Sequence, residues 1–259
     1  MLIPMRSDAY DRLFEIEATL WWYRGRRAVC KRLLDRALPA TRDLRVLDVG
    51  CGTGFNMRLF ERYGAVEGVD TAAEALAYCR RRGLERVRQA DAASLPFADD
   101  TFDLVTALDI IEHLDDDVAA LREFARVLKP GGTLLVYTPA LPALYGDHDR
   151  VVGHRRRYMK RLLRDRLEAA GYTVRHLSYV NLVVLPAVLL VRLALRWVTD
   201  RPHVEMSLPP SPANALLTLV SWAEVPLVTR LGLPFGLSLV ALARRSNRAV
   251  PRAALSPGR

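Results

Sequence analysis

The sequence predicts an α/β protein built on a doubly wound, mostly parallel β-sheet. Three observations favour this class. Strand-like and helix-like segments alternate between residues 44 and 139, a glycine-rich turn joins the first strand to its helix, and a length of 259 residues suits one sizeable domain. The strand-like segments are short apolar runs, as expected for strands buried on both faces of a parallel sheet.

The chain before the alternating region is predicted to be helical. Apolar residues recur there at roughly helical spacing: Leu13, Ile16, Leu20, Val29, Leu33 and Leu34. Residues 1–43 are therefore predicted to form a helical cap. Strands are then expected at 44–50, 65–70, 85–91, 102–109 and 133–139, and helices at 55–64, 72–83 and 115–132. Gly64 is expected to close the first of these helices and KPGG the last.

The later half of the chain does not continue this alternation of strands and helices. A helix at 158–172 and a strand at 173–181 are expected to complete a core of residues 44–180. Residues 181–230 are mostly apolar and are predicted to form a helical insert or lid. The last core strand is expected within 231–245, and the polar tail 246–259 is predicted to be disordered.

Charge is divided unevenly along the chain. Residues 1–150 carry 21 basic and 24 acidic side chains, whereas residues 151–259 carry 17 and 5, and the net charge is +9. The basic part suggests an anionic partner, either nucleic acid, anionic lipid or a phosphorylated substrate. The three cysteines have no paired spacing and no apolar signal core opens the chain, so a cytoplasmic location is expected.

The segment VLDVGCGTGFN lies where the first strand meets its helix. Gly50, Gly52 and Gly54 have no side chains, so the turn can be sharp and a ligand can approach the backbone. Asp70 ends the second strand, where a carboxylate can accept hydrogen bonds from both hydroxyls of a ribose. Asp91 ends the third strand, at the edge where open α/β sheets bind ligands.

Five segments in this order resemble the class I S-adenosylmethionine-dependent methyltransferases: VLDVGCGTG, VEGVD, QADAASLPF, FDLVTALDIIEHLDD and VLKPGGTLLVYTP. The resemblance covers residues 44–180 and, at LPFGLSLVALARR, the last strand. It implies a Rossmann-like sheet of seven strands with an antiparallel last strand, and S-adenosylmethionine as the cofactor.

The resemblance also implies roles for single residues. The three glycines would wrap the methionine part of the cofactor, Asp70 would hold the ribose, and the adenine would lie at Asp91 and Ala92. Asp109 would lie near the methionine, and Asp48 would help position its amino group. Helices before the first strand cover the cofactor in this fold, so Tyr23 and Arg24 are candidates to close over the carboxylate. The alternative for that helix is packing of its tryptophans on the core with its arginines exposed.

Candidate catalytic residues follow two strands. His113, next to Glu112, comes directly after the fourth strand and is a candidate base, or a polar residue of the turn. His154 and Tyr158 match an H-x-x-x-Y segment similar to one in small-molecule and quinone methyltransferases. His154 is expected on the acceptor side, as a base or as a structural histidine. The stretch Asp147 to Asp149 contains potential metal ligands, but adjacent residues rarely converge on one ion, so no metal is predicted.

The segment from Gly146 to Arg161 is dense in arginine. It is expected to form the rim of the acceptor pocket, with His154 turned inward and most of the arginines outward. Arg155, Arg156 and Arg157 are adjacent and therefore point in different directions, so they are not expected to form one site. At least one is expected in solvent, and the others are candidates to bind a phosphate, a carboxylate or an anionic membrane.

The apolar insert contains thirteen uncharged residues from Tyr179 to Val191, followed by Arg192 and Arg196. This run is too short to span a bilayer and contains Pro186. It is predicted to lie on a membrane, to line an apolar pocket or to form an ordinary helical lid.

The sequence therefore predicts a methyltransferase that acts on a hydrophobic small molecule. An anionic acceptor and a lipid-linked acceptor are both open alternatives within that class. It is expected in the cytoplasm, with the inner face of the membrane as a peripheral site. The alternatives are an RNA-modifying enzyme, which the absence of a recognisable RNA-binding module disfavours, and a non-catalytic cofactor-binding scaffold.

Overall fold

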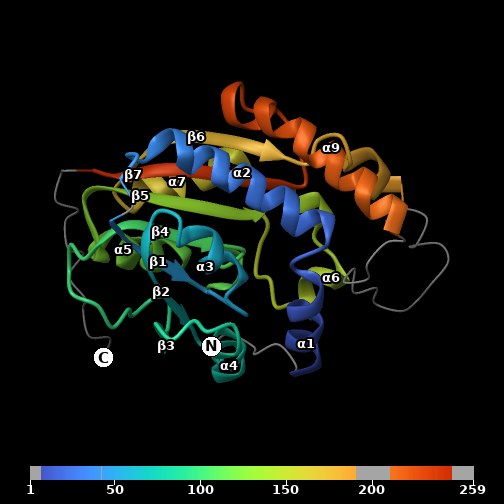
Figure 1. Ribbon diagram of the computed structural model, residues 1–259. Coiled ribbons are helices and arrows are strands. Elements are labelled where there is room, and N and C mark those ends of the chain that lie inside the picture. The colour runs from blue at the N-terminus through green and yellow to red at the C-terminus, as the bar shows by residue number, and fades with distance from the viewer. Residues whose placement is uncertain (1–6, 42, 191–210, 247–259) are drawn as a thin grey trace, which may run out of the picture.

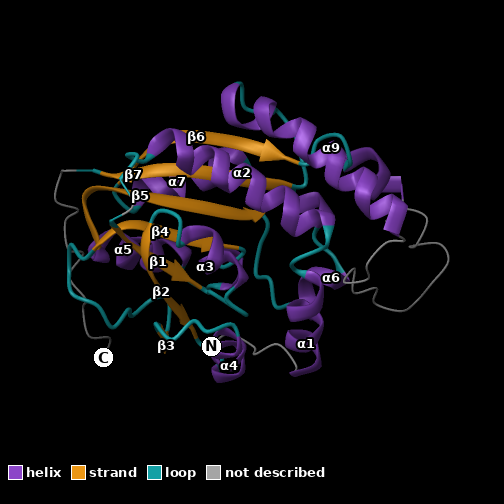
Figure 2. Ribbon diagram, in the orientation of Figure 1, coloured by secondary structure: helices purple, strands orange, loops and turns teal. Residues whose placement is uncertain are grey.

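The computed structural model describes residues 7–41, 43–190 and 211–246. Its centre is a seven-stranded sheet in the order β3-β2-β1-β4-β5-β7-β6 (Figures 1 and 2). The strands are β1 Leu44–Val49, β2 Gly64–Asp70, β3 Val87–Gln89, β4 Phe102–Leu108, β5 Leu128–Pro139, β6 Tyr172–Val180 and β7 Ser238–Arg245. Neighbouring strands from β3 to β5 are parallel, whereas β7 is antiparallel to both β5 and β6. The predicted mostly parallel sheet with an antiparallel last strand is confirmed.

Helices cover both faces of this sheet (Figure 1). They are α1 Ser7–Ile16, α2 Trp21–Ala37, α3 Phe55–Phe60, α4 Ala73–Arg81, α5 Asp117–Val127, α6 Asp147–Val151, α7 Lys160–Ala169 and α9 Ser211–Arg230. Short 3-10 turns lie at Ile111–His113 and Pro142–Leu144. On one face α2 packs against α3 and α9; on the other, α5 packs against α7.

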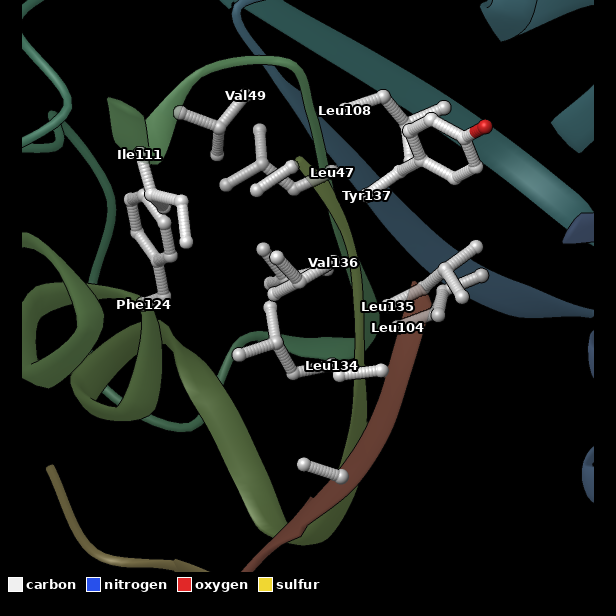
Figure 3. Close-up of a cluster of buried hydrophobic side chains, with 14 of the residues drawn as sticks. Leu47, Val49, Leu104, Leu108, Ile111, Phe124, Leu134, Leu135, Val136 and Tyr137 are labelled. Atoms are coloured by element: carbon white, nitrogen blue, oxygen red, sulfur yellow. The ribbon is translucent and has the colours of Figure 1, made fainter. Parts of the chain in front are cut away.

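The core lies where the central strands meet these layers. Leu47, Leu104 and Val136 are fully buried on three adjacent strands, and Phe124 of α5 packs in the same cluster (Figure 3). Burial of one such side chain contributes about 1.5–3 kcal/mol. The near-continuous apolar runs of β1, β4 and β5 are therefore explained by burial on both faces.

Two predicted boundaries are corrected. The helix expected at 115–132 ends at Val127, and KPGG lies inside β5 instead of stopping a helix. A register shift of β5 against β4, with Gly131 at φ 73°, accommodates these residues in the strand. The helix expected at 55–64 ends at Phe60, and Gly64 begins β2. Glycine is needed at the start of this strand because a Cβ there would lie 1.9 Å from the Leu44 carbonyl oxygen.

The described part of the insert is helical at residues 185–190 and in α9, and residues 181–184 form a turn before the first of these helices. Arg192 and Arg196 lie outside the described residues, and so does the tail from residue 247. Among the helices that the structure describes, none is both long and apolar enough to cross a membrane.

Candidate active site

The glycine turn after β1 opens toward the carboxyl edge of the sheet. Gly50, Gly52 and Gly54 have φ values of 69°, 54° and 82°, a region that favours glycine. A Cβ on Gly50 would lie 1.8 Å from Cδ1 of Ile110, so no side chain fits there. A Cβ on Gly52 would meet nothing within 4 Å, so open space lies beside this backbone. The turn is shaped for close approach of a ligand.

Asp70 braces this turn from the end of β2. One carboxylate oxygen accepts the Gly52 N–H at 2.9 Å, and the other accepts the Ala72 N–H at 3.0 Å. Burial raises the pKa of Asp70, and these backbone hydrogen bonds lower it. The carboxylate is half-buried and is fixed at the edge where the resemblance places a ribose.

The two residues assigned to the adenine lie beyond β3. Asp91 is exposed, and its side chain accepts the Ala93 N–H at 2.8 Å. Ala92 is buried. The carboxyl ends of three neighbouring strands therefore carry these residues at one edge of the sheet: Asp91 follows β3, Asp70 ends β2 and Gly52 follows β1.

Asp109 lies just after β4 with φ 56° and forms an ion pair with Arg26 of α2. Arg26 is buried, 5.0 Å from the ring centroid of Tyr23. Arg24, the arginine expected to close over the carboxylate of the cofactor, lies over the Trp222 ring of α9, 4.8 Å from its centroid. Arg26 was not predicted from the sequence. Helical periodicity could have indicated it, since Arg26 shares a face of α2 with buried Val29 and not with Arg24.

Asp48 is buried inside β1, where its carboxylate accepts the Thr106 hydroxyl at 2.5 Å. Burial raises the pKa of Asp48 to about 7. The side chain is therefore protonated over much of the acidic range in the folded protein.

We expect the stability of the protein to depend on Asp48 and pH. The folded-state pKa lies above the unfolded value, so the contribution of Asp48 to the free energy of unfolding is complete below about pH 4 and is lost as the pH rises to about 7. Asp48→Asn keeps the acceptor for Thr106 and cannot ionise. It should exceed the wild type by on the order of 3 kcal/mol at about pH 8 and nearly match it at about pH 4.

Urea unfolding of the cofactor-free protein at both pH values measures this difference. Asp165→Asn changes an exposed carboxylate of α7 and serves as the control. A difference between Asp48→Asn and the wild type that stays constant with pH would contradict the prediction.

Three candidate residues meet after β4. The rings of His113 and His154 lie edge to face with centroids 4.7 Å apart, and His154 Nε2 lies 3.9 Å from Oε1 of Glu112. Burial, followed by His154, lowers the pKa of His113 to about 4. The other His154 nitrogen, Nδ1, lies 2.7 Å from Oδ1 of buried Asp149 in α6. The sequence pattern missed both α6 and the role of Asp149.

The basic segment around His154 is largely neutralised by nearby acidic groups. Arg155 pairs with Asp115, Arg156 with Asp117 and Arg157 with Asp149. Arg157 is buried as the partner of the Asp149 carboxylate, whereas Arg155 is exposed. These pairs stabilise the two loops against each other and do not form a continuous cationic surface.

Tyr158 is also buried, with no exposed area, and its hydroxyl donates to Oδ2 of Asp117 at 2.7 Å. This position does not favour the catalytic role predicted from the H-x-x-x-Y match. The side chain instead holds Asp117, which also binds Arg156.

Comparison with known proteins agrees with this geometry. A model of the methyltransferase domain family matches residues 47–136. A phosphatidylethanolamine N-methyltransferase of Cereibacter sphaeroides is 34% identical over 139 residues, which are 51% of this chain and 68% of that protein. A demethylmenaquinone methyltransferase of Thermus thermophilus is 41% identical over 142 residues, 52% of this chain and 61% of that protein. The chain spans roughly half to two thirds of such relatives.

Solved methyltransferase structures share this fold. A phosphoethanolamine N-methyltransferase of Haemonchus contortus, solved with S-adenosyl-L-methionine, superposes with a TM-score of 0.55 at 19% identity, covering 84% of this chain and 52% of that one. The open glycine turn and the fixed Asp70 carboxylate fit this cofactor, which needs close backbone approach and an acceptor for its ribose hydroxyls. The cofactor is S-adenosylmethionine, and the chain belongs to the class I S-adenosylmethionine-dependent methyltransferases.

Proposed function

We propose that this protein methylates a hydrophobic small molecule that it takes from a membrane surface. The observation that carries this proposal is the orientation of α9, whose buried side chains are mostly polar, with Val228 as the apolar exception, and whose large exposed side chains are apolar. A surface helix of a globular protein usually has the reverse arrangement.

The inner face of α9 is polar because it binds backbone groups of its neighbours. Buried Glu224 accepts hydrogen bonds from the N–H groups of Asn181 and Leu182, each at 2.7 Å. These two residues lie just before the helical residues 185–190. Asn214 accepts the Trp21 N–H at 2.9 Å at the first turn of α2. These bonds fix which side of α9 points inward.

The outer face of α9 is correspondingly apolar. Leu216 and Leu219 are 61% and 63% exposed, and the residues beside α9 continue the same surface. We call this surface the α9 apolar face; its large exposed residues are Leu216, Leu219, Trp222, Leu227 and Leu231. Clusters of exposed apolar side chains mark sites that meet lipid or another protein. The +12 balance of residues 151–259 favours an anionic lipid surface.

The relatives support a hydrophobic acceptor. The names of two of them specify phosphatidylethanolamine and demethylmenaquinone, both amphiphilic or apolar compounds. The proposal extends that class of acceptor to this chain and leaves the particular compound open.

The reaction is a direct displacement at the methyl group. Bound S-adenosylmethionine would supply the methyl group: the electron pair of the acceptor atom would bond to the methyl carbon, S-adenosylhomocysteine would leave, and the proton of an O–H or N–H acceptor would pass to water. The chain contributes position: the glycine turn and Asp70 hold the cofactor, and the acceptor side is formed by His113 in the turn after β4 and by His154 in the loop after α6.

Transfer of labelled methyl groups from S-adenosylmethionine to lipid, quinone and tRNA fractions tests the proposal. We expect label in the lipid or quinone fraction and none with Asp70→Ala. Label confined to tRNA would replace the proposal with the RNA alternative. No label in any fraction would favour the non-catalytic scaffold.

We expect the protein to bind anionic vesicles through the α9 apolar face. Binding at low salt should weaken as salt rises, because exposed charges are screened. The double variant Leu216→Ser/Leu219→Ser should bind at least about tenfold more weakly, since each buried leucine contributes about 1.5–3 kcal/mol.

Co-sedimentation with phosphatidylglycerol-containing vesicles measures this binding. Val151→Ser, at a 53% exposed apolar position on α6, is the matched control and should bind like the wild type. Absence of binding at low salt, or equal binding by the double variant, would overturn the membrane part of the proposal.

A further inference from the structure

We propose that Glu112, His113 and His154 bind a divalent transition-metal ion. Each residue offers one ligand atom, and the three atoms lie within 4.8 Å of one another. The site differs from the consecutive residues 147–149, because its ligands come from two segments that fold together. Those segments are the turn after β4 and the loop after α6.

The Glu112 carboxylate supplies the first argument. Its side chain has no exposed area, and Oε2 accepts the Thr138 hydroxyl at 2.9 Å. The other oxygen, Oε1, has no hydrogen-bond partner among the described residues. A buried carboxylate oxygen without a partner is costly, and a cation at this position would remove that cost.

The orientation of His154 supplies the second argument. Asp149 engages Nδ1 at 2.7 Å, so Nε2 points toward Oε1 of Glu112, 3.9 Å away. Asp149 is itself fixed by Arg157, whose Nε donates at 2.8 Å. A carboxylate on the far nitrogen is the usual companion of a metal-binding histidine, because it fixes the ring and its tautomer.

The two segments are held together by the backbone. The Arg155 N–H donates to the Glu112 carbonyl at 2.7 Å, and the His154 N–H donates to the Asp149 carbonyl at 2.7 Å. The backbone that carries His154 is therefore fixed against the backbone that carries Glu112. Ligand atoms about 2.1 Å from a tetrahedral ion lie about 3.4 Å apart, so His154 Nε2 and Glu112 Oε1, 3.9 Å apart, need to approach by roughly 0.5 Å, and a pair at the 4.8 Å limit by roughly 1.4 Å.

The ligand set selects the class of ion. Two imidazole nitrogens and one carboxylate oxygen suit zinc, cobalt, iron or manganese, whereas magnesium and calcium prefer oxygen ligands. Three protein ligands leave a coordination position for water or for an oxygen of the acceptor. A bound ion occupies the lone pair of His154, so this residue acts as a ligand and not as the base predicted from the sequence. The proposal that the site binds an ion does not depend on the proposed methyl transfer. Only the role of the open coordination position in binding the acceptor rests on that function.

Calorimetric titration of the chelator-treated protein with Zn²⁺, and with Co²⁺ while its visible absorption is recorded, tests the site. We expect one ion per chain, a four- or five-coordinate Co²⁺ spectrum and a Tm that rises with Zn²⁺. Glu112→Gln and His154→Ala should each weaken binding by more than about 100-fold, and Asp149→Asn by about 10–100-fold.

His148→Ala is the matched control, because the His148 ring lies 6.3 Å from that of His154 but outside the three-residue group. It should bind Zn²⁺ like the wild type. Circular dichroism establishes that each variant is folded. Failure of the wild type to bind either ion, or equal binding by folded Glu112→Gln, would overturn the metal site. Titration with S-adenosylhomocysteine in the same samples reports separately on the methyltransferase assignment.

Discussion

Replacing Asp70 by alanine is expected to lower the affinity for S-adenosylhomocysteine at least about tenfold. Hydrogen bonds to a charged group contribute about 1.5–3 kcal/mol, and about 1.4 kcal/mol corresponds to a factor of ten. The variant loses the ribose acceptor. It also loses the carboxylate oxygen that accepts the Gly52 N–H at 2.9 Å and thereby shapes the glycine turn.

Calorimetric titration of the purified variant measures the change. Glu67→Ala is the matched control on the same strand, because Glu67 pairs with Arg45 and Arg88 rather than with the glycine turn. The control should bind like the wild type. A folded Asp70→Ala protein with unchanged affinity would remove Asp70 from the cofactor site.

Replacing Asp149 by alanine is expected to lower the free energy of unfolding by about 3–5 kcal/mol. Asp149 has no exposed area and accepts from Arg157, from the Gly146 N–H and from His154. Its removal leaves the buried Arg157 guanidinium without its carboxylate partner, which is the costly way to break a buried pair. Such a loss is a large share of the roughly 5–15 kcal/mol that stabilises a domain.

Urea unfolding measures this loss. Asp147→Ala, two residues earlier in α6, breaks a pair with Arg150 in which both side chains are about two-thirds exposed. Exposed pairs contribute about 0–1 kcal/mol, so the control should differ little from the wild type. Equal stability of the two variants would mean that Asp149 is not the partner on which Arg157 depends.

Local pattern was enough to predict the alternating core. The strands and helices between residues 44 and 139 follow from apolar runs, glycine turns and helical spacing, which act between residues close in sequence. The same local signals predicted the open glycine turn and the position of Asp70 at the end of β2. Boundaries at KPGG and Gly64 failed because contacts between strands decided them.

Contacts between distant residues came only from the tertiary structure. The Arg26–Asp109 pair joins positions 83 residues apart, and Glu112 meets His154 across two loops. Periodicity shows which residues share a face, but it does not show which partner that face meets. Arg24 was therefore named from the sequence, whereas Arg26 was found only in the packed structure.

The insert is the clearest case. Its composition predicted apolar helices, with a lid, a pocket or a membrane surface as alternatives. Composition does not show which side of a helix faces the rest of the protein. The orientation of α9 is set by Glu224 and Asn214, which bind backbone groups of residues 181–183 and of the start of α2. Those partners are about 40 and 190 residues away along the chain, and satisfying buried polar groups outweighs burial of the leucines. The sequence by itself determined that the helix is apolar, and only the tertiary structure decided that its apolar side faces outward.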